Sequence, residues 1–391
     1  MPRNSGKTSR RPGGTGISSQ PRAQQHSTRA IFFILGFAVS AWAPIVPFVK
    51  TRAGLNDAAL GLVLLCLGAG SLVAMPLAGA LTARHGCRKI LIAALLLICP
   101  ILPALSLVKS TWLLGVTLFC FGAALGTMDC AMNMQAVVVE RESGKAMMSG
   151  FHAFYSIGGF AGAGIMAAVL SLGAPSWSAC LVVDAIILGL FAFSSPYWRT
   201  DRVAQDAPVF AVPRGVVLLI GALCLITFLA EGSMLDWSAV FLHEQRGVAV
   251  SRAGLGFAVF SSMMTVTRLL GDRLVQRLGR LRTVAIGGVC ASAGFLIATL
   301  VPVWEAALAG YMLVGLGCAN IVPVLYSLTG QQKDMPERLA IPAITTMGYA
   351  GILAGPALIG FIAHSTSLMT AFTAVAASML VVAASMRWLR V

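Results

Sequence analysis

Apolar runs long enough to cross about 30 Å of hydrocarbon as helices recur twelve times along this sequence. The runs cover residues 30–49, 57–82, 90–108, 112–139, 147–171, 176–194, 215–242, 252–277, 283–302, 304–329, 339–363 and 366–386. Only 11% of the residues are Asp, Glu, Lys or Arg, whereas soluble domains carry about 25%. So few charges cannot cover a surface in water, which excludes a soluble enzyme and a disordered chain. The sequence predicts an all-α membrane protein with twelve transmembrane helices.

Two polar segments divide these spans. Residues 1–29 are basic and lack the apolar core of a signal peptide, so we expect a disordered cytoplasmic tail. The longest internal polar stretch, residues 195–214, separates the spans into six and six. The sequence therefore predicts two six-helix bundles, over residues 30–194 and 215–391, joined by a cytoplasmic linker.

The basic residues are unevenly distributed between the two sides of the membrane. If the N-terminus lies inside the cell, the termini and loops on that side hold 22 of the 28 Lys and Arg residues. Because positive charges concentrate on the cytoplasmic side of membrane proteins, we expect both termini in the cytoplasm. This distribution explains the net charge of +14 without a nucleic-acid partner.

Motifs for metals and cofactors are missing from the sequence. The nine cysteines show neither metal-ligand spacing nor a disulfide framework, and there is no phosphate-binding glycine loop. We therefore expect no metal, no cofactor and no coupling to ATP.

An internal repeat relates the two halves. Gly61 and Gly86 are 25 residues apart in the first half, and Gly254 and Gly279 have the same separation in the second. The loops around the later glycines read Gly-Ala-Leu-Thr-Ala-Arg-His-Gly-Cys-Arg-Lys over residues 79–89 and Asp-Arg-Leu-Val-Gln-Arg-Leu-Gly-Arg-Leu-Arg over residues 272–282. A glycine turn flanked by cations is typical of a tight cytoplasmic connection between two transmembrane helices.

This loop pattern resembles the best-known signature of the major facilitator superfamily, and the resemblance extends over about residues 30–387. In the family, an acidic residue before the arginine latches the outward-open state, but here the two positions are Ala83 and Gln276. Four segments also resemble a bacterial subgroup that includes the membrane proteins MosC and YbjJ: residues 129–133, 149–159, 231–237 and 315–323.

The resemblance implies a fold and a mode of action. The fold consists of two pseudo-symmetric six-helix bundles that rock about a central cavity lined by spans 1, 4, 7 and 10. Repeats related by an axis along the membrane normal place the substrate near the midplane, between the two bundles. The resemblance thus implies a transporter and not an enzyme.

Ionisable residues within the spans are the first candidates for function, because such groups are costly in hydrocarbon. Asp129 lies near the middle of the fourth span, with Asn133 one turn further on the same face. His152 and Tyr155 form part of a polar stripe at about that depth on the fifth span. Asp129 is the predicted proton carrier, with His152 or Glu231 as a second titrating group. The alternative for each is a structural hydrogen bond between helices.

The seventh span carries two acids. Glu231 and Asp236 are five residues apart, so an unbroken helix would point them about 140° apart. Gly232 and Ser233 lie between them and can break the helix, as happens at the binding sites of carriers. Asp236, nearer the external end, is a candidate gate residue.

Gating at the cytoplasmic side is predicted from three further charges. Arg268 and Asp272 are one turn apart on the eighth span, so we expect them to pair and brace the gate. Direct binding of an anionic substrate by Arg268 is the alternative. Arg84 in the first signature loop is the third candidate.

Neutral polar and aromatic residues complete the predicted substrate site. Trp42 precedes Pro44 and Pro47, which can kink the first span. Aromatic faces with amide and hydroxyl partners suit a sugar or a polyol, although each residue is also compatible with helix packing. The predicted substrate-binding residues are Trp42, Asn133, Tyr155, Glu231, Asn320, Tyr326 and Tyr349.

The leading hypothesis is a monomeric, multi-pass secondary transporter of the bacterial cytoplasmic membrane, such as a proton symporter. Its expected partners are a small polar solute (a sugar, polyol or derivative), the lipid bilayer and protons as the coupling ion. Two alternatives stay open: a proton-linked efflux antiporter for drugs or metabolites, and a sensor that binds a solute without moving it.

Overall fold

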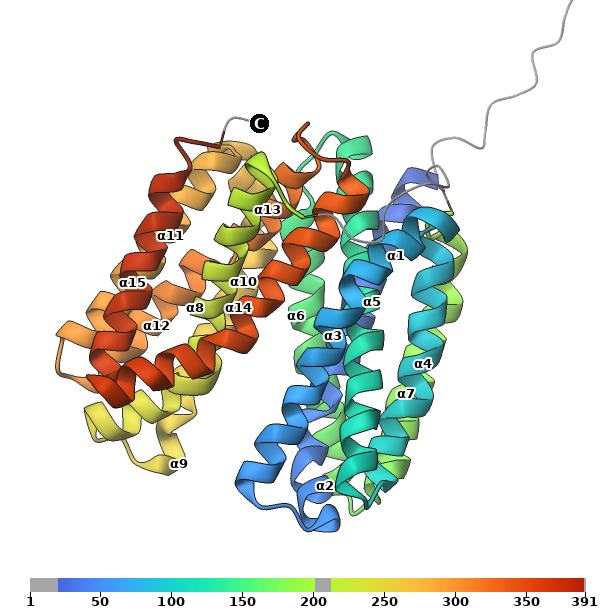
Figure 1. Cartoon of the computed structure of the whole chain (residues 1–391), viewed down its shortest axis with the longest axis horizontal. Coiled ribbons are helices and arrows are strands. Elements are labelled where there is room, and N and C mark those ends of the chain that lie inside the picture. The colour runs from blue at the N-terminus through green and yellow to red at the C-terminus, as the bar shows by residue number, and fades with distance from the viewer. Residues whose placement is uncertain (1–19, 201–211, 390–391) are drawn as a thin grey trace, which may run out of the picture.

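The computed structural model describes residues 20–200 and 212–389, and within them every regular element is helical. Figure 1 shows them as two bundles of long helices. In chain order they are α1 (Gln20–Ala41), η1 (Ala43–Ile45), α2 (Val46–Ala53), α3 (Asp57–His85), α4 (Cys87–Leu107), α5 (Thr111–Ser143), α6 (Met148–Ser171), α7 (Ser176–Ser194), η2 (Ser195–Tyr197), α8 (Gly215–Arg246), α9 (Val250–Ala253), α10 (Leu255–Leu278), α11 (Arg280–Leu300), α12 (Trp304–Cys318), α13 (Ile321–Thr329), α14 (Glu337–Ser365) and α15 (Leu368–Ser385).

These elements form twelve membrane crossings. Eleven helical segments are long and apolar enough to span a bilayer. The twelfth crossing is α10, whose second half is charged because it carries Arg268, Asp272, Arg273 and Arg277. The predicted fold class, an all-helical protein with twelve transmembrane segments, is therefore confirmed.

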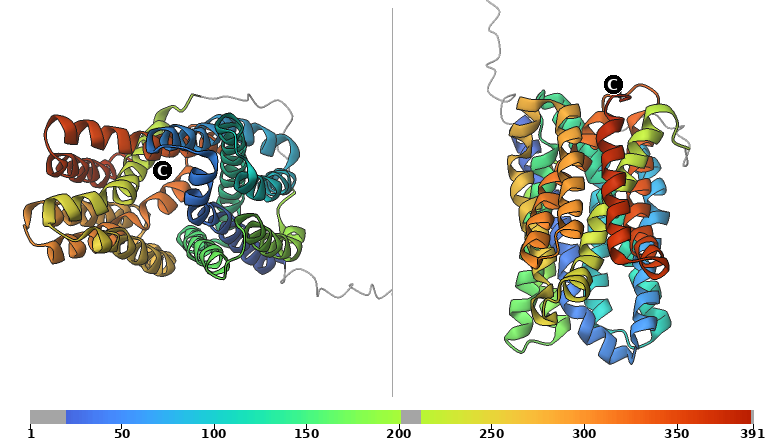
Figure 2. Two further views of the ribbon diagram at one scale, coloured as in Figure 1. Left: turned by 90° about the horizontal axis from the view of Figure 1, so that it is seen from below. Right: turned by 90° about the vertical axis from the view of Figure 1, so that its left-hand side faces the viewer.

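Each bundle is held together by helices that are distant in sequence. In the first lobe (α1–α7), α1 packs on α6 and α3 on α5, while in the second lobe (α8–α15) α8 packs on α14 and α11 on α12. The lobes meet mainly through α3 with α14 and α6 with α10, and also through α13 with α6 and α14 with α5. Figure 2 shows the two lobes side by side when viewed along the helices.

The two lobes are close at one end and diverge toward the other. Figure 1 shows them approaching one another near the C-terminus and separating toward α2 and α9. At the first end, which we call the closed end, Glu140 and Arg141 of α5 pair with Arg280 and Glu337 of the second lobe. The opposite end is called the splayed end below. If the predicted orientation holds, the closed end faces the cytoplasm.

The repeat seen in the sequence is present in the backbone. Gly86 between α3 and α4 has φ 85° and ψ 152°, and Gly279 between α10 and α11 has φ 82° and ψ 157°. Positive φ is easy only for glycine, so both helical hairpins depend on this residue type. The same turn therefore recurs at equivalent places in the two lobes.

Breaks interrupt the first crossing, as the sequence permitted, and also the tenth, where none was predicted. The first crossing is interrupted between Ala41 and Val46, around Pro44, and the tenth is interrupted at Ala319 and Asn320. In contrast, α8 is continuous through Gly232, so the possible break of the seventh span is wrong. Helical hydrogen bonds and close packing of α8 on α14 favour the regular conformation.

The ends of the lobes also differ from expectation. Residues 20–29, predicted as part of a disordered tail, are the first turns of α1, where Thr28 bonds Gln135 of α5. The rest of that tail, residues 1–19, lies outside the described residues, as do residues 201–211 of the predicted linker. The linker residues before that gap are bound to the first lobe, because the Arg199 amide donates to Gln135 Oε1 at 3.1 Å.

Candidate functional site

A cluster of polar residues lies where the two lobes meet, in the middle of their helices. The first lobe contributes Asp129 from α5 and Tyr155 from α6, and the second contributes Glu231 from α8 and Arg268 from α10. Tyr155 lies close enough to Asp129, Glu231 and Arg268 to interact with the charges of all three. Tyr349 of α14 is in turn within range of Asp129 and Tyr155. The structure thus brings together residues that the sequence placed on four separate spans.

Asp129 points into the protein, where it lies beside Asn133. Its side chain is 8% exposed. The Asn133 amide donates to the Asp129 carbonyl at 3.0 Å and to Asp129 Oδ1 at 3.4 Å. These bonds fix the orientation of the amide and leave Asn133 Oδ1 buried without a partner. No described cation pairs with Asp129.

Arg268 is buried and connects the two lobes. Its Nη2 lies 3.6 Å from Glu231 Oε2, and its Nε donates to the Ala319 carbonyl at 3.2 Å. Its Nη1 donates to Ser156 Oγ of α6 at 3.0 Å. The expected pair with Asp272 is therefore replaced, because tertiary partners at three elements satisfy the guanidinium better than a neighbour one turn away.

The break in the tenth crossing supplies one of these partners. Because the helix stops at Cys318 and resumes at Ile321, the carbonyl of Ala319 is available to Arg268. Asn320 lies in the same break, where its Oδ1 faces Gly271 of α10 and has no hydrogen-bond partner. A side chain on residue 271 would occupy the position of that oxygen.

His152 and Tyr326 meet across the lobe interface. Their ring centroids are 6.0 Å apart, and His152 also makes an edge contact with Phe32 of α1 at 5.2 Å. The Tyr326 hydroxyl and the Thr345 hydroxyl of α14 are 2.7 Å apart. His152 Nε2 has no partner among the described residues.

Among the remaining predicted substrate and gate residues, Tyr349 belongs to the cluster, whereas Trp42, Asp236 and Arg84 are placed less centrally. Trp42 is buried at the break of the first crossing, and Tyr349 packs at 6.4 Å against Phe228 of α8. Asp236 is exposed near the splayed end of α8. Arg84 is exposed at the closed end, and it makes no ion pair within the described chain.

Unpartnered polar atoms gather around this cluster. Four side-chain atoms there are buried without a hydrogen bond to any described residue: Asn133 Oδ1, His152 Nε2, Glu231 Oε1 and Asn320 Oδ1. A buried polar group left unpaired costs about 1–3 kcal/mol, so such atoms are usually partnered in proteins. These four are among thirteen such atoms in the described chain, and those of Asn133, His152 and Glu231 belong to helices that meet at the lobe interface.

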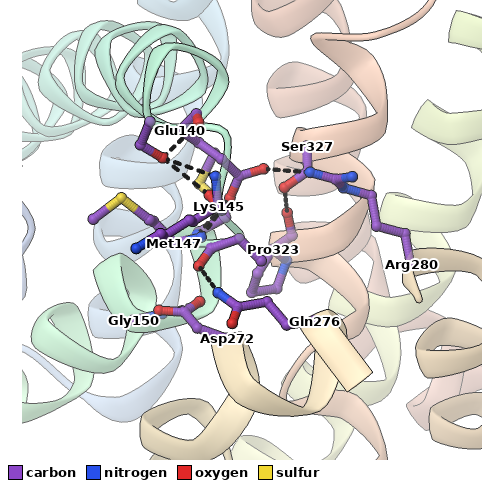
Figure 3. A network of polar contacts seen from close by, with 12 residues as sticks. Glu140, Lys145, Met147, Gly150, Asp272, Gln276, Arg280, Pro323 and Ser327 are labelled. Atoms are coloured by element: carbon purple, nitrogen blue, oxygen red, sulfur yellow. Dashed lines mark hydrogen bonds and ion pairs between the residues drawn. The ribbon is translucent and has the colours of Figure 1, made fainter. Parts of the chain in front are cut away.

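A second group of polar residues closes the lobes at the closed end, and Glu140 is its centre (Figure 3). Glu140 is 4% exposed, and its Oε2 accepts the amides of Met147 and Met148 at 2.8 Å each. Its Oε1 accepts Arg280 Nη2 of the second lobe at 3.3 Å. Glu140 therefore binds the N-terminus of α6 and the start of α11 together.

Asp272 contributes a second contact to the same helix terminus. Its Oδ1 accepts the Gly150 amide at 3.0 Å, so an acid of the second lobe caps α6 of the first. Nearby, Gln276 donates to the Ala146 carbonyl at 3.4 Å. A cavity of about 230 Å³ lies beside this network, between Glu140, Arg280 and Ser327.

Glu140 was not among the residues predicted from the sequence, although its neighbour Asp272 was. Glu140 stands immediately before Arg141 and Glu142 at the end of an apolar run. In that position it has the appearance of a solvated loop charge, because no local pattern shows that the chain turns back to place α6 above it. Within the described residues, no group of His, Cys, Asp and Glu is arranged to hold a metal ion.

Comparison with known proteins decides the family. The sequence model of the Major Facilitator Superfamily matches residues 30–248 and 219–391, which together span both lobes. The chain belongs to this superfamily.

Relatives agree over nearly the full length. An uncharacterised MFS-type transporter of Yersinia pestis is 51% identical over 93% of this chain and 95% of its own. The membrane protein MosC of Rhizobium meliloti is 31% identical over 93% of this chain and 89% of its own. These matches support the predicted MosC-like group and identify the chain as a transporter by family, not an enzyme.

Solved structures with this fold include a Major Facilitator Superfamily transporter, FucP, in the outward conformation. It superposes with a TM-score of 0.80 at 17% identity and covers 95% of this chain and all of its own. The human organic anion transporter MFSD10 superposes with a TM-score of 0.74 at 14% identity, covering 95% of this chain and 99% of its own. Two pseudo-symmetric six-helix lobes are thus the shared architecture.

Proposed function

We propose that this superfamily member is a proton-coupled secondary transporter, which moves a small polar organic solute across the bacterial cytoplasmic membrane. The solute is a sugar, a polyol or a derivative of one. The transporter acts as a monomer with both termini in the cytoplasm. Asp129 carries the proton, and His152 or Glu231 is the second titrating group.

The observation that carries this proposal is the buried polar cluster between the lobes. Ionisable side chains within a membrane protein are expensive and face the bundle interior or a wetted path when they have a function. Asp129 and Glu231 lie inside the protein and not against lipid, on helices of opposite lobes. The unpartnered atoms of Asn133 and His152 at the same interface offer hydrogen bonds to a solute.

Alternating access follows from the position of the contacts. The cross-lobe bonds of Glu140, Asp272 and Arg141 all lie at the closed end, while the lobes diverge at the splayed end. Rocking that breaks these bonds and joins the splayed end would expose the central cluster to the other side of the membrane. Arg268, bonded to Ser156 across the interface, lies on the path of that movement.

The test is transport by the full chain in proteoliposomes, in which internal pH is recorded while candidate solutes are added. Asp129→Asn should abolish solute-driven proton movement while solute binding is retained. Asp184→Asn is the matched control, because Asp184 is also a buried acid but lies on α7, outside the lobe interface. Normal proton-driven accumulation by the Asp129 variant would refute the assignment of the proton to this residue.

A further inference from the structure

The cavity at the closed end is separate from the central cluster, and both lobes line it. Its volume is about 230 Å³, slightly below the range of about 300–1,000 Å³ for the sites of drug-sized ligands. A space of this size suits a compact metabolite. The first lobe contributes Val137, Glu140, Arg141 and Gly144 at the end of α5, and the second contributes Arg280 of α11, Ser327 of α13, and Gly330 and Gln331 after it.

The cavity is complete only while the lobes are together at this end. A Cβ atom on Gly330 would overlap Cγ1 of Val137, so the end of α13 packs directly against α5. Figure 3 shows Ser327 and Arg280 side by side on the second lobe, across from Glu140 of the first. A compound in this cavity therefore contacts both lobes, and it loses part of its contacts when they separate.

Two guanidinium groups line the cavity, one from each lobe. Arg280 donates to Glu140 Oε1, and both of its Nη atoms donate to Gln331 Oε1 at 3.2 Å in the amide orientation that gives both groups a partner. Three of its five N–H groups are used in this way, and the other two have no described acceptor. Arg141 pairs through Nη1 with Glu337, while its Nη2 and Nε have no described acceptor. Both guanidiniums therefore keep donors for a further group.

The charges on the cavity wall favour an anion. The acid on the wall, Glu140, is already bound by two backbone amides and by Arg280. The C-terminal ends of α5 and α13 add partial negative charges of about half an elementary charge each, and the start of α11 adds a partial positive one. These partial charges are smaller than the full charge on each guanidinium, so an excess of positive charge remains.

The ion pair of Arg141 does not prevent its use for a ligand. The Arg141 side chain is 52% exposed, and Glu337 approaches it from outside the cavity wall. An exposed ion pair contributes only about 0–1 kcal/mol, and a guanidinium can bind a second anion through its remaining N–H groups. Arg141 is therefore available to an anion in the cavity.

Three classes of compact metabolite can be compared on these grounds. An ammonium compound would be repelled by the two guanidiniums. A neutral sugar can donate to Ser327 Oγ, whose own hydrogen goes to the Pro323 carbonyl, but it leaves the guanidiniums without a counter-ion. A sugar phosphate supplies the same hydroxyls and a phosphate that carries about −1.5 to −2 charge at pH 7, with three acceptor oxygens that can serve both guanidiniums.

We propose that this cavity binds a small hydroxylated phosphate ester, whose phosphate bridges Arg141 of the first lobe and Arg280 of the second. Because the bridge exists only while the lobes are together at this end, the bound ester stabilises the state of this structure. Ester that reaches the protein from the side of the closed end therefore inhibits transport. This last consequence, unlike the binding itself, rests on the proposed function.

The first test measures the melting temperature of the purified full chain at constant ionic strength. The probes are glucose 6-phosphate and glycerol 3-phosphate, with glucose, glycerol, glucuronate and inorganic phosphate for comparison. We expect a saturable rise with at least one of the two esters, and a smaller rise or none with the comparison compounds at the same concentration. If neither ester stabilises the protein, or if glucuronate or inorganic phosphate does so equally well, the proposal is wrong.

A lipid headgroup carries the same phosphate chemistry, so the source of the phosphate is tested separately. The ester series is repeated in nanodiscs of phosphatidylcholine and in nanodiscs that also contain phosphatidylglycerol. The ester should bind in both, because the proposed ligand is soluble. Loss of ester binding in the phosphatidylglycerol nanodiscs would assign the cavity to a lipid headgroup and overturn the proposal.

Three variants test the position of the phosphate. Arg141→Gln should raise the Kd of the ester at least about tenfold, because one of the two guanidiniums is lost. Glu337→Gln removes the same ion pair but leaves Arg141 on the cavity wall, so the ester should bind as well as before or more tightly. Arg84→Gln removes an exposed arginine of the same lobe that does not line the cavity, and it should change the Kd by less than about twofold. Equal weakening by Arg141→Gln and Glu337→Gln, or by Arg141→Gln and Arg84→Gln, would overturn the bridge.

Hydrogen–deuterium exchange tests whether the ester holds the lobes together. Glu140 accepts the amides of Met147 and Met148 only while the closed end is formed as in this structure. Saturating ester should therefore slow exchange in the first turn of α6. Unchanged exchange with the ester bound would show that it does not bridge the lobes.

Transport measurements allow this proposal and the proposed function to fail separately. In proteoliposomes, ester on the side of the closed end should inhibit solute-driven proton movement, and ester on the other side should not. If the ester binds and slows exchange but no solute moves protons, the cavity site stands and the proposed function is wrong. If solutes move protons and no ester binds or inhibits, the transporter stands and the cavity site is wrong. Binding without inhibition from the closed end would overturn the stabilised state.

Discussion

The α3–α4 and α10–α11 hairpins are related by the internal repeat, yet they contact the opposite lobe in different ways. The first does so by close packing: at Gly79 of α3, even a Cβ atom would overlap Pro342 and lie only 3.2 Å from the Arg338 carbonyl oxygen, in the first turns of α14. The second does so with charges: Asp272 accepts the Gly150 amide of α6, and Arg280 binds Glu140. Gly79 and Asp272 occupy the same position in the two copies of the loop.

The two copies of the repeat thus share the same glycine turn, but one contacts the opposite lobe by close packing and the other by charged groups. The family's usual acid is replaced by Ala83 and Gln276, so neither copy has a carboxylate at that position. In the second copy, Asp272 provides a carboxylate four residues earlier, and it caps a helix of the other lobe. Closure by the α3–α4 hairpin thus depends on close packing, whereas closure by the α10–α11 hairpin depends on charge.

The largest effect on the stability of the closed end is expected for substitution of Glu140, which binds Arg280 of the α10–α11 hairpin. Glu140→Gln removes the charge that accepts the amides of Met147 and Met148 and binds Arg280. Hydrogen bonds to charged groups contribute about 1.5–3 kcal/mol, so we expect the closed end to lose about 2–3 kcal/mol of stability. Hydrogen–deuterium exchange of the first turn of α6 should become faster by one to two orders of magnitude.

Glu142→Gln is the matched control for this variant. Glu142 lies two residues further along α5, is half exposed, and pairs with Arg199 within its own lobe at 2.5 Å. Loss of its charge should change the exchange rate at α6 by less than about fivefold, because exposed pairs contribute about 0–1 kcal/mol. Equal effects of the two substitutions would remove Glu140 from the interface that closes the lobes.

A somewhat smaller effect is expected for substitution of Gly79, in the α3–α4 hairpin, which contacts the second lobe by close packing. In Gly79→Val the new side chain would overlap Pro342, so α3 and α14 must separate. Overpacking typically costs about 1–3 kcal/mol, and here it falls on the closed state alone. Gly61→Val on the same helix is the control, since no atom lies within 4 Å of the Cβ there. Faster exchange at the start of α14 in the Gly79 variant only would support this reading, and equal exchange would contradict it.

Asp272→Asn should have a smaller effect again, of about 1 kcal/mol, because it weakens a single helix cap. Asp334→Asn provides the comparison: Asp334 accepts the Val216 amide at 2.7 Å and so caps α8 within the second lobe. Both substitutions should lower the melting temperature. Only Asp272→Asn should also open the closed end, measured as faster exchange of the Gly150 amide. Opening by both would show that the cap of Asp272 is not specific to the lobe interface.

The sequence predicted much of this architecture because its determinants are local. Span length, the glycine turns and the positions of the acids can each be read from a few neighbouring residues. The partners of those residues could not be predicted in the same way. Arg268 and Asp272 have the spacing of an ion pair, but their actual contacts come from α6, α8 and the break after α12. Which of two nearby groups pairs with a charged side chain is determined by the way in which whole helices pack.

Arg84 gives the smallest expected effect and the sharpest contrast between the hairpins. It was a gating candidate because it occupies the arginine position of the first loop, but it is exposed and forms no ion pair within the described chain. Arg84→Ala should therefore change stability and exchange at the closed end by less than about 0.5 kcal/mol. Arg280→Ala, which removes the cation bound to Glu140, should open that end measurably. If the Arg84 variant opened it as far, the first hairpin would also act through charge, and the division between shape and charge would be wrong.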